Sequence, residues 1–278
     1  MAALLALLAA SLFGLGDFCG GLASRRISAL RVVASTHIIG LLLVLAAAPL
    51  MAEAFSVEAL LLGALAGAFG MIGIGLLYRG LGRGPMAVVA PITAVNSAAI
   101  PVVWGLAFGE QLSTLHVLGI LVGLLAIVLV SRIPGDATAI PKSLVLESML
   151  AGSGFAAFFI VIDAAQDQTA PWPLVGARIA SVLLTLALLA LRGGPRLPLR
   201  MEGVTGLIVA TGVFDMAANV AFLLAVNTGL LSLVSVLAAL YPATTVVLAR
   251  VVLSERMSRT QVLGMFGAVG SVALIALG

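Results

Sequence analysis

The sequence has little charge and almost no cysteine. Of its 278 residues, 62% are hydrophobic and only 9% are charged, whereas a soluble domain carries roughly 25% charged residues. An ordinary soluble globular protein is therefore excluded. The single cysteine, Cys19, excludes an internal disulfide bond and any metal site built from several cysteines. We expect neither a metal nor a cofactor.

The chain also lacks the short motifs of several enzyme and pump classes. It contains no P-loop and no HExxH sequence, so transport driven by ATP would require a partner protein. The net charge of +3 reflects loop arginines that face a membrane surface, and it indicates no nucleic-acid partner. The expected partners are a small-molecule substrate and membrane lipid, for a chain that works as a monomer.

Apolar runs long enough to cross a bilayer follow one another along the chain. A helix needs about 20 predominantly apolar residues to cross, and glycines, prolines and charge clusters divide the chain into such runs with short links. No basic segment precedes the first run, so we interpret it as a mature helix and not as a signal peptide. The predicted fold is an all-α membrane protein with ten transmembrane helices, at residues 2–22, 28–50, 57–80, 85–107, 113–132, 143–165, 172–192, 202–226, 230–252 and 258–277.

The basic residues gather in alternate links. Thirteen of the fourteen lie in, or at the span ends beside, the links that follow the first, third, fifth, seventh and ninth spans, and the exception, Arg178, lies deeper inside the seventh span. The positive-inside rule makes the basic side cytoplasmic and places both termini outside. We therefore expect a multi-pass protein of a bacterial inner membrane. The thirteen residues are Arg25, Arg26, Arg31, Arg79, Arg83, Arg132, Lys142, Arg192, Arg196, Arg200, Arg250, Arg256 and Arg259.

An internal repeat relates the two halves at an offset of 145 residues. GAFGM (67–71) aligns with GVFDM (212–216), and the register needs no gap from residue 62 to residue 132. Each half holds five spans, an odd number, so the second repeat must enter the membrane upside down. Inverted repeats around a midplane site are typical of secondary transporters, which alternate access by rocking one repeat against the other. The predicted repeats are 1–135 and 142–278.

The end of the chain resembles a known family. The segment LYPATTVVLARVVLSERMSRTQVLGMFGAVGSVALIAL (240–277) is similar to the end of an EamA-type repeat of the drug/metabolite transporter superfamily. That pattern has a proline, a glutamate thirteen residues later and then a glycine-containing helix, and Pro242, Glu255 and Gly264 fit it. In the first half, Ser97 stands where the proline would be.

The resemblance implies a ten-helix exporter of small metabolites and not an enzyme. Family members move amino acids, nucleobase-like compounds or cationic drugs, and the aromatic amino-acid exporters are the group that this chain resembles most. Many such exporters are thought to keep their termini in the cytoplasm, so the outside termini indicated by the charges are a departure. A multidrug or cationic-compound exporter and a passive facilitator of the same fold are the alternatives.

An intramembrane aspartyl protease is a rival from a different class. GLGD (14–17) matches the GxGD signature of those enzymes, which need two aspartates that share a proton, and Asp17 and Asp215 are the available pair. In those enzymes the signature belongs to a later catalytic helix, whereas here it lies in the first span. Their architecture also has no place for an inverted repeat of five spans.

Polar side chains inside the predicted spans are the candidate functional residues, because a polar group in hydrocarbon is costly unless it faces protein or water. Asp215, Asp17 and His37 are the candidates for proton coupling. Asp215 and Asn219 are four residues apart and share a helix face, where the alternative role is a hydrogen-bonded bridge between helices. The candidates for substrate binding are Tyr78, Asn96, Tyr241, Asp215, Asn219, His37 and Arg178.

Several of these residues have a structural alternative. Arg178 aligns with His37 at an offset of about 141 residues. Arg178 could hold a substrate carboxylate, pair with Asp163 or extend to the membrane surface, and His37 could be a packing residue. Tyr78 suits an interface anchor. Tyr241 lies mid-span before a proline, where an aromatic ring can stack on a substrate.

Two further patterns concern the acidic residues at helix ends and the counterpart of Asp215 in the first repeat. Glu110 and Glu255 lie at helix ends beside Ser113 and Ser258, so we interpret them as structural groups near helix caps. In the first repeat, Gly70 occupies the position of Asp215. This helix of the repeat therefore does not need a carboxylate to fold, which strengthens the functional interpretation of Asp215.

Overall fold

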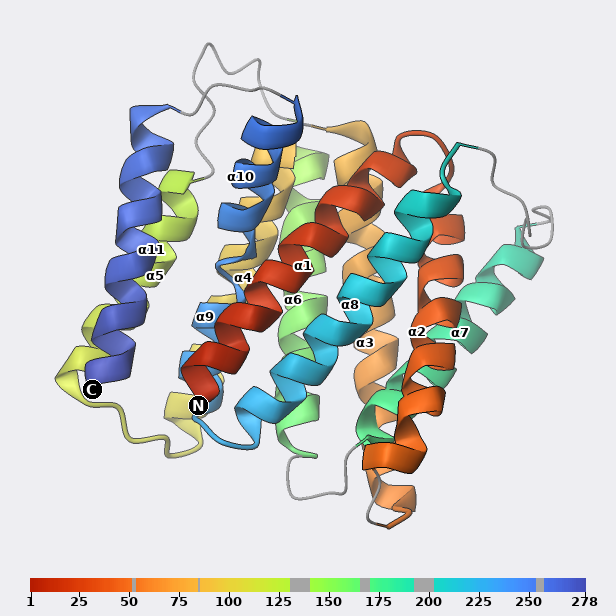
Figure 1. Ribbon diagram of the computed structural model, residues 1–278, viewed down its shortest axis with the longest axis horizontal. Coiled ribbons are helices and arrows are strands. Elements are labelled where there is room, and N and C mark those ends of the chain that lie inside the picture. The colour runs from red at the N-terminus through yellow and green to blue at the C-terminus, as the bar shows by residue number, and fades with distance from the viewer. Residues whose placement is uncertain (52–53, 85, 131–140, 166–170, 193–202, 254–257) are drawn as a thin grey trace.

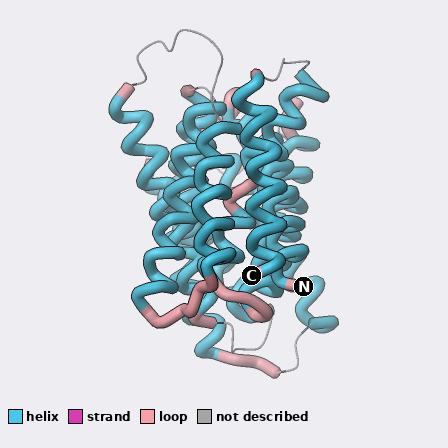
Figure 2. Tube along the Cα trace, turned by 90° about the vertical axis from the view of Figure 1, so that its left-hand side faces the viewer, coloured by secondary structure: helices cyan, strands magenta, loops and turns pink. Residues whose placement is uncertain are grey.

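The computed structural model describes residues 1–51, 54–84, 86–130, 141–165, 171–192, 203–253 and 258–278. These residues form helices and no strands (Figures 1 and 2). Eight of the helices are long and apolar enough to cross a membrane. The helices are α1 (Ala2–Ser24), α2 (Ala29–Met51), α3 (Val57–Arg83), α4 (Met86–Ala107), α5 (Thr114–Val130), α6 (Lys142–Asp163), α7 (Trp172–Leu191), α8 (Thr205–Val226), α9 (Leu231–Ala238), α10 (Tyr241–Leu253) and α11 (Arg259–Leu277).

The predicted ten-span, all-α fold is confirmed, with one correction. The ninth span, predicted as continuous over 230–252, is divided into α9 and α10 by a turn at Ala239 and Leu240. The physical cause is Pro242, which has no N–H to donate to the carbonyl of Ala238 four residues earlier. In the first repeat Ser97 occupies the matching position, and α4 runs through it without a break.

The two halves interdigitate (Figure 1). Helix α1 packs against α8, and its repeat counterpart α6 packs against α3, the counterpart of α8. Helices α5 and α11 pack against each other at one side of the bundle. Both ends of the chain lie at the same end of the bundle in Figure 1. We call this the terminal end, and the opposite end, where α1, α3 and α7 finish, the basic end.

Repeat-related glycines explain the α5–α11 contact. At Gly119 a Cβ atom would stand 2.7 Å from the Ile275 side chain, and at Gly264 it would stand 2.5 Å from the backbone nitrogen of Val130. The hydroxyl of Ser271 donates to the carbonyl of Gly119 over 2.7 Å. These glycines match in the repeat because each lets the backbones of the two helices approach closely.

The α3–α7 contact is closer than its repeat counterpart, α2–α8. At Gly67, on α3, a Cβ atom would overlap the carbonyl oxygen of Ala177 on α7. At the matching Gly212, on α8, it would stand 3.0 Å from the carbonyl oxygen of Thr36 on α2. The α3–α7 approach is in the first half of both helices, toward the terminal end, so the structure is closed more tightly there.

The predicted caps are present where the structure describes them. Ser258 and Gln261 form a capping box at the start of α11. The backbone N–H of His116 donates to the Ser113 hydroxyl over 3.1 Å. The carboxylate of Glu110 accepts the backbone N–H of Ser232 at 3.2 and 3.4 Å, so it caps α9 of the other half. Glu255 lies outside the described residues.

Removing the Glu110 cap should have a measurable cost. Glu110→Ala leaves a donor in the first turn of α9 without its carboxylate partner, and the loss of an N-cap typically costs about 1 kcal/mol. We expect a lower Tm for the purified protein in detergent. The neighbouring Gln111 is exposed, so Gln111→Ala is the matched control. Equal Tm values for the two variants would contradict the capping role.

Candidate functional site

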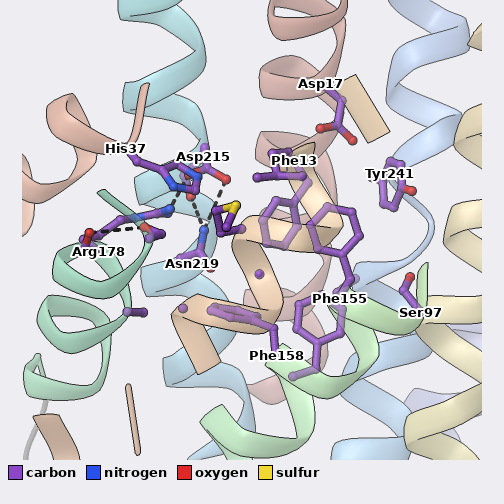
Figure 3. A pocket seen from close by; sticks show the side chains of 18 of the residues that line it. Phe13, Asp17, His37, Ser97, Phe155, Phe158, Arg178, Asp215, Asn219 and Tyr241 are labelled. Atoms are coloured by element: carbon purple, nitrogen blue, oxygen red, sulfur yellow. Dashed lines mark hydrogen bonds and ion pairs between the residues drawn. The ribbon is translucent and has the colours of Figure 1, made fainter. Parts of the chain in front are cut away.

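A small cavity lies at the centre of the bundle, between helices of both halves (Figure 3). Its walls come from α1, α2, α3 and α4 of the first half and from α6 to α10 of the second. The free volume inside it is about 50 Å³. Since a water-accessible space of about 10–15 Å³ is enough to hold one water, there is room for a few waters. An organic substrate would require the walls to move apart.

A buried ion pair forms one wall of the cavity. Arg178 on α7 donates through Nη2 to Oδ2 of Asp215 on α8 over 2.5 Å. The two side chains are only 9% and 14% exposed. Asn219, one turn further along α8, donates to Oδ1 of Asp215 over 3.3 Å and to its backbone carbonyl over 2.7 Å. The predicted Asp215–Asn219 face is thus joined to Arg178, whose partner here is Asp215 and not Asp163.

His37 on α2 lies on the same side of the cavity (Figure 3). Its side chain is buried, and among the described residues its Nδ1 has no hydrogen-bond partner. Arg178 reaches this helix as well, because its Nε lies 3.1 Å from the place where a Cβ would stand at Gly40, also on α2. Three helices therefore meet around one guanidinium, and an unused imidazole nitrogen lies nearby.

Asp17 on α1 is the second carboxyl group of the cavity. It is 8% exposed and lines the cavity wall. No hydrogen bond or ion pair joins it to any other part of the chain that the structure describes. The adjacent residue, Gly16, packs against α8: a Cβ atom at Gly16 would stand 3.6 Å from the backbone nitrogen of Asp215. Asp17 is therefore a buried acid that lines the same cavity as the Arg178–Asp215 pair and has no ion partner in the described part of the chain.

Phenylalanine rings fill much of the remaining wall. Phe13 comes from α1, and Phe155, Phe158 and Phe159 come from a single stretch of α6 (Figure 3). The Phe159 ring lies 6.3 Å from that of Phe13 and stacks on Phe222 at 4.2 Å. We call Phe13, Phe155, Phe158 and Phe159 the phenylalanine cluster. These phenylalanines were not among the predicted site residues, although FAAFF (155–159) repeats phenylalanine at helical spacing.

The break between α9 and α10 also opens onto the cavity. Ala238, Ala239 and Tyr241 line it, and the Tyr241 hydroxyl donates to the carbonyl of Ala90 on α4 over 3.1 Å. Ser97, the repeat counterpart of Pro242, lines the cavity from α4. Interrupted helices at a midplane site are a recurrent feature of transporters.

Two of the predicted site residues lie elsewhere. Tyr78 is buried with its ring against Gly20 of α1, and it lines a separate hollow at the basic end of the bundle. Asn96 on α4 donates to the carbonyl of Met149 on α6 over 2.8 Å, which places it between two helices. The structure thus brings together Asp17, His37, Arg178, Asp215, Asn219 and Tyr241 around the cavity.

The hollow at the basic end is much larger than the central cavity. Its volume is about 690 Å³, and its walls come from the end of α1, the start of α2 and the ends of α3 and α7. We call it the basic vestibule, because its lining includes Arg31, Arg79, Arg83 and Arg192. Met71 lines both the vestibule and the central cavity. Met71 therefore borders both spaces.

Asp17 and Asp215 are not arranged as the catalytic pair of an aspartyl protease. Asp17 and Asp215 line the same cavity, but Asp215 is engaged by Arg178 and Asn219. A catalytic dyad requires two carboxyl groups that share one proton. Here the Asp215 carboxylate is bound by a guanidinium and an amide, and no hydrogen bond joins it to Asp17 within the described residues.

Comparison with known proteins gives a family and a fold. A model of the EamA-like transporter family matches residues 1–132 and 143–277. A crystal structure of another protein superposes with a TM-score of 0.76 at 19% sequence identity, covering 99% of this chain and 97% of that one. A search of curated proteins found no match.

Proposed function

The chain belongs to the EamA-like transporter family, and from this premise we propose that it exports amino acids with aromatic or other bulky apolar side chains. The observation that carries the proposal is the position of Asp17, a buried acid that has no ion partner among the described residues and shares its cavity with a phenylalanine cluster and an arginine. Burying an ionised carboxylate without a partner is expensive. A ligand that brings a cation would remove that cost.

An amino acid of this kind has three parts, and the cavity offers a group for each. The ammonium group pairs with Asp17. The apolar side chain lies among the phenylalanine rings, with Tyr241 at the helix break. The carboxylate binds Arg178, which donates one N–H to Asp215 and has other N–H groups in its five-donor fork.

Transport proceeds by alternating access of the two inverted repeats. The close α3–α7 contact and the open basic vestibule support a state that is closed toward the terminal end. Placing the basic end in the cytoplasm of a bacterial inner membrane, as the arginine distribution favours, makes this the loading state of an exporter. The central cavity must widen for the substrate to enter, and Met71 and the phenylalanine rings are the side chains to be displaced.

Asp17 also provides a means of energy coupling. When the cavity is empty, a proton neutralises the carboxyl group, and a substrate ammonium displaces that proton. Asp215 and Tyr241 line the same cavity as Asp17, and Asp215 is already paired with Arg178. Exchange of a proton for a substrate at one carboxylate makes the transporter an antiporter, because both cannot bind at once.

Neutralising Asp17 tests the proposal directly. The measurement is uptake of radiolabelled L-phenylalanine into proteoliposomes, with and without an imposed pH gradient. A hydrogen bond to a charged group contributes about 1.5–3 kcal/mol, so Asp17→Asn should raise KM by about tenfold or more and abolish the response to the gradient. Glu58→Gln, at an exposed acid in the first turn of α3, is the control and should behave as the wild type.

Two results would count against the proposal. Wild-type protein that takes up no amino acid excludes the substrate class, and Asp17→Asn with a normal gradient response excludes the coupling. The unpaired Asp17 beside aromatic rings also suits a cationic compound without a carboxylate. Uptake of L-phenylalaninamide in preference to L-phenylalanine would favour that second function.

A further inference from the structure

We propose that the basic vestibule is a second binding site, which holds the substrate carboxylate before the substrate passes Met71 into the central cavity. This inference rests on the proposed export of amino acids. It concerns a space distinct from the central cavity, with walls of its own. The vestibule has a volume of about 690 Å³, which is ample for an amino acid without any movement of the helices.

The charges of the vestibule favour an anion. Arg31, Arg83 and Arg192 line it from α2, α3 and the end of α7, and within the described ranges none of them has an ion partner. Arg79 is paired with Glu147 at 3.3 Å and is therefore largely compensated. A hollow lined by charges of one sign with low-dielectric walls concentrates ions of the opposite sign.

The backbone adds to this positive potential. Ser28, Ala29 and Leu30, at the start of α2, form part of the vestibule wall. The first N–H groups of a helix have no partner within the helix, and the helix dipole gives that end a partial positive charge. Guanidinium groups and a helix N-terminus thus face the same space, and together they are suited to a carboxylate.

The remaining wall suits the rest of an amino acid. Leu76 on α3 and Leu188 and Leu189 on α7 line the vestibule, so an apolar side chain can lie against them while the carboxylate contacts the arginines. Met71 borders both this space and the central cavity. Methionine is unbranched and flexible, so rotation of one side chain would connect the vestibule with the central cavity.

The test uses a reporter cysteine at Gly75. A Cβ at Gly75 would have no atom within 4 Å, and the residue lines the vestibule. The variant is Gly75→Cys with Cys19→Ser, reconstituted into phosphatidylcholine vesicles. An anionic methanethiosulfonate should modify it about tenfold faster than a cationic one of similar size, because the local potential attracts it. Adding Arg31→Gln, Arg83→Gln and Arg192→Gln should remove this preference.

Protection by substrate then assigns the ligand. L-phenylalanine should slow modification of the reporter cysteine, whereas L-phenylalaninamide, which lacks the carboxylate, should not. The proposal is overturned if the two reagents react equally fast, if both amino compounds protect equally, or if neither protects. Protection that requires phosphatidylglycerol in the vesicles would overturn it in favour of an anionic lipid site.

Measuring L-phenylalanine uptake by the wild-type protein distinguishes failure of the vestibule site from failure of the proposed export function. If L-phenylalanine is transported but does not protect the reporter cysteine, the vestibule site is wrong and the proposed function stands. If L-phenylalanine protects but is not transported, the vestibule binds amino acids and the proposed function is wrong.

Discussion

Replacing Arg178 by glutamine is expected to be among the most damaging single changes in this protein. The substitution leaves Asp215 buried without its cation, and breaking a buried ion pair from one side costs about 3–5 kcal/mol. Asn219 continues to donate to Asp215, but an amide does not replace a full positive charge. The measurement is the free energy of unfolding, or Tm, of the purified variant in detergent.

A double variant separates the structural cost from a role in transport. Arg178→Gln combined with Asp215→Asn removes both charges, so most of the lost stability should return. If Arg178 binds the substrate carboxylate, the double variant folds but transports poorly. If it transports L-phenylalanine normally, the pair is only structural. Arg79→Gln is the control, because Arg79 is 47% exposed in its pair with Glu147 and should change stability by about 1 kcal/mol or less.

Gly67→Ala is expected to have the next largest effect. The added Cβ would overlap the carbonyl oxygen of Ala177, which is backbone and cannot rotate away. The two helices must therefore separate, and forced overpacking of this kind costs about 1–3 kcal/mol. We expect a lower Tm together with a loss of transport, because α3 and α7 can no longer close at the terminal end.

Gly75→Ala is the matched control on the same helix. Its Cβ enters open space, and alanine favours a helix over glycine by about 1 kcal/mol, so stability should be unchanged or slightly higher. If both variants lose stability to the same extent, the Gly67 effect comes from the loss of a flexible residue and not from the α3–α7 contact.

The number of membrane spans, their approximate ends and the caps followed from the sequence because their causes are local. Length of the apolar runs sets the spans, and Ser258 with Gln261 is a sequence-level signature of a helix start. The sequence analysis predicted a continuous ninth span, although Pro242 lies within it. A proline inside a transmembrane span often leaves the helix continuous, as Pro91 and Pro101 do in α4.

The identity of most polar residues at the cavity was predicted, but their pairing was not. Asp17, His37, Arg178 and Asp215 stand out because charge is rare in hydrocarbon. Which of them meet depends on how each helix is rotated, and hydrophobic periodicity does not reveal that, since lipid and protein interior are both apolar. The phenylalanine cluster was hidden for the same reason, because phenylalanine suits either environment.

The unequal helix contacts have a thermodynamic consequence. If the two repeats were identical in sequence, the inward-open and outward-open states would have equal free energies. Here three glycines, Gly63, Gly67 and Gly176, lie against backbone at the α3–α7 contact, whereas Ile208 and Ser35 occupy the positions that match Gly63 and Gly176 at α2–α8. Each 1.4 kcal/mol of bias shifts the populations about tenfold. The empty protein therefore rests mainly in one state, and a transported molecule shifts the populations only if it binds the rarer state more tightly.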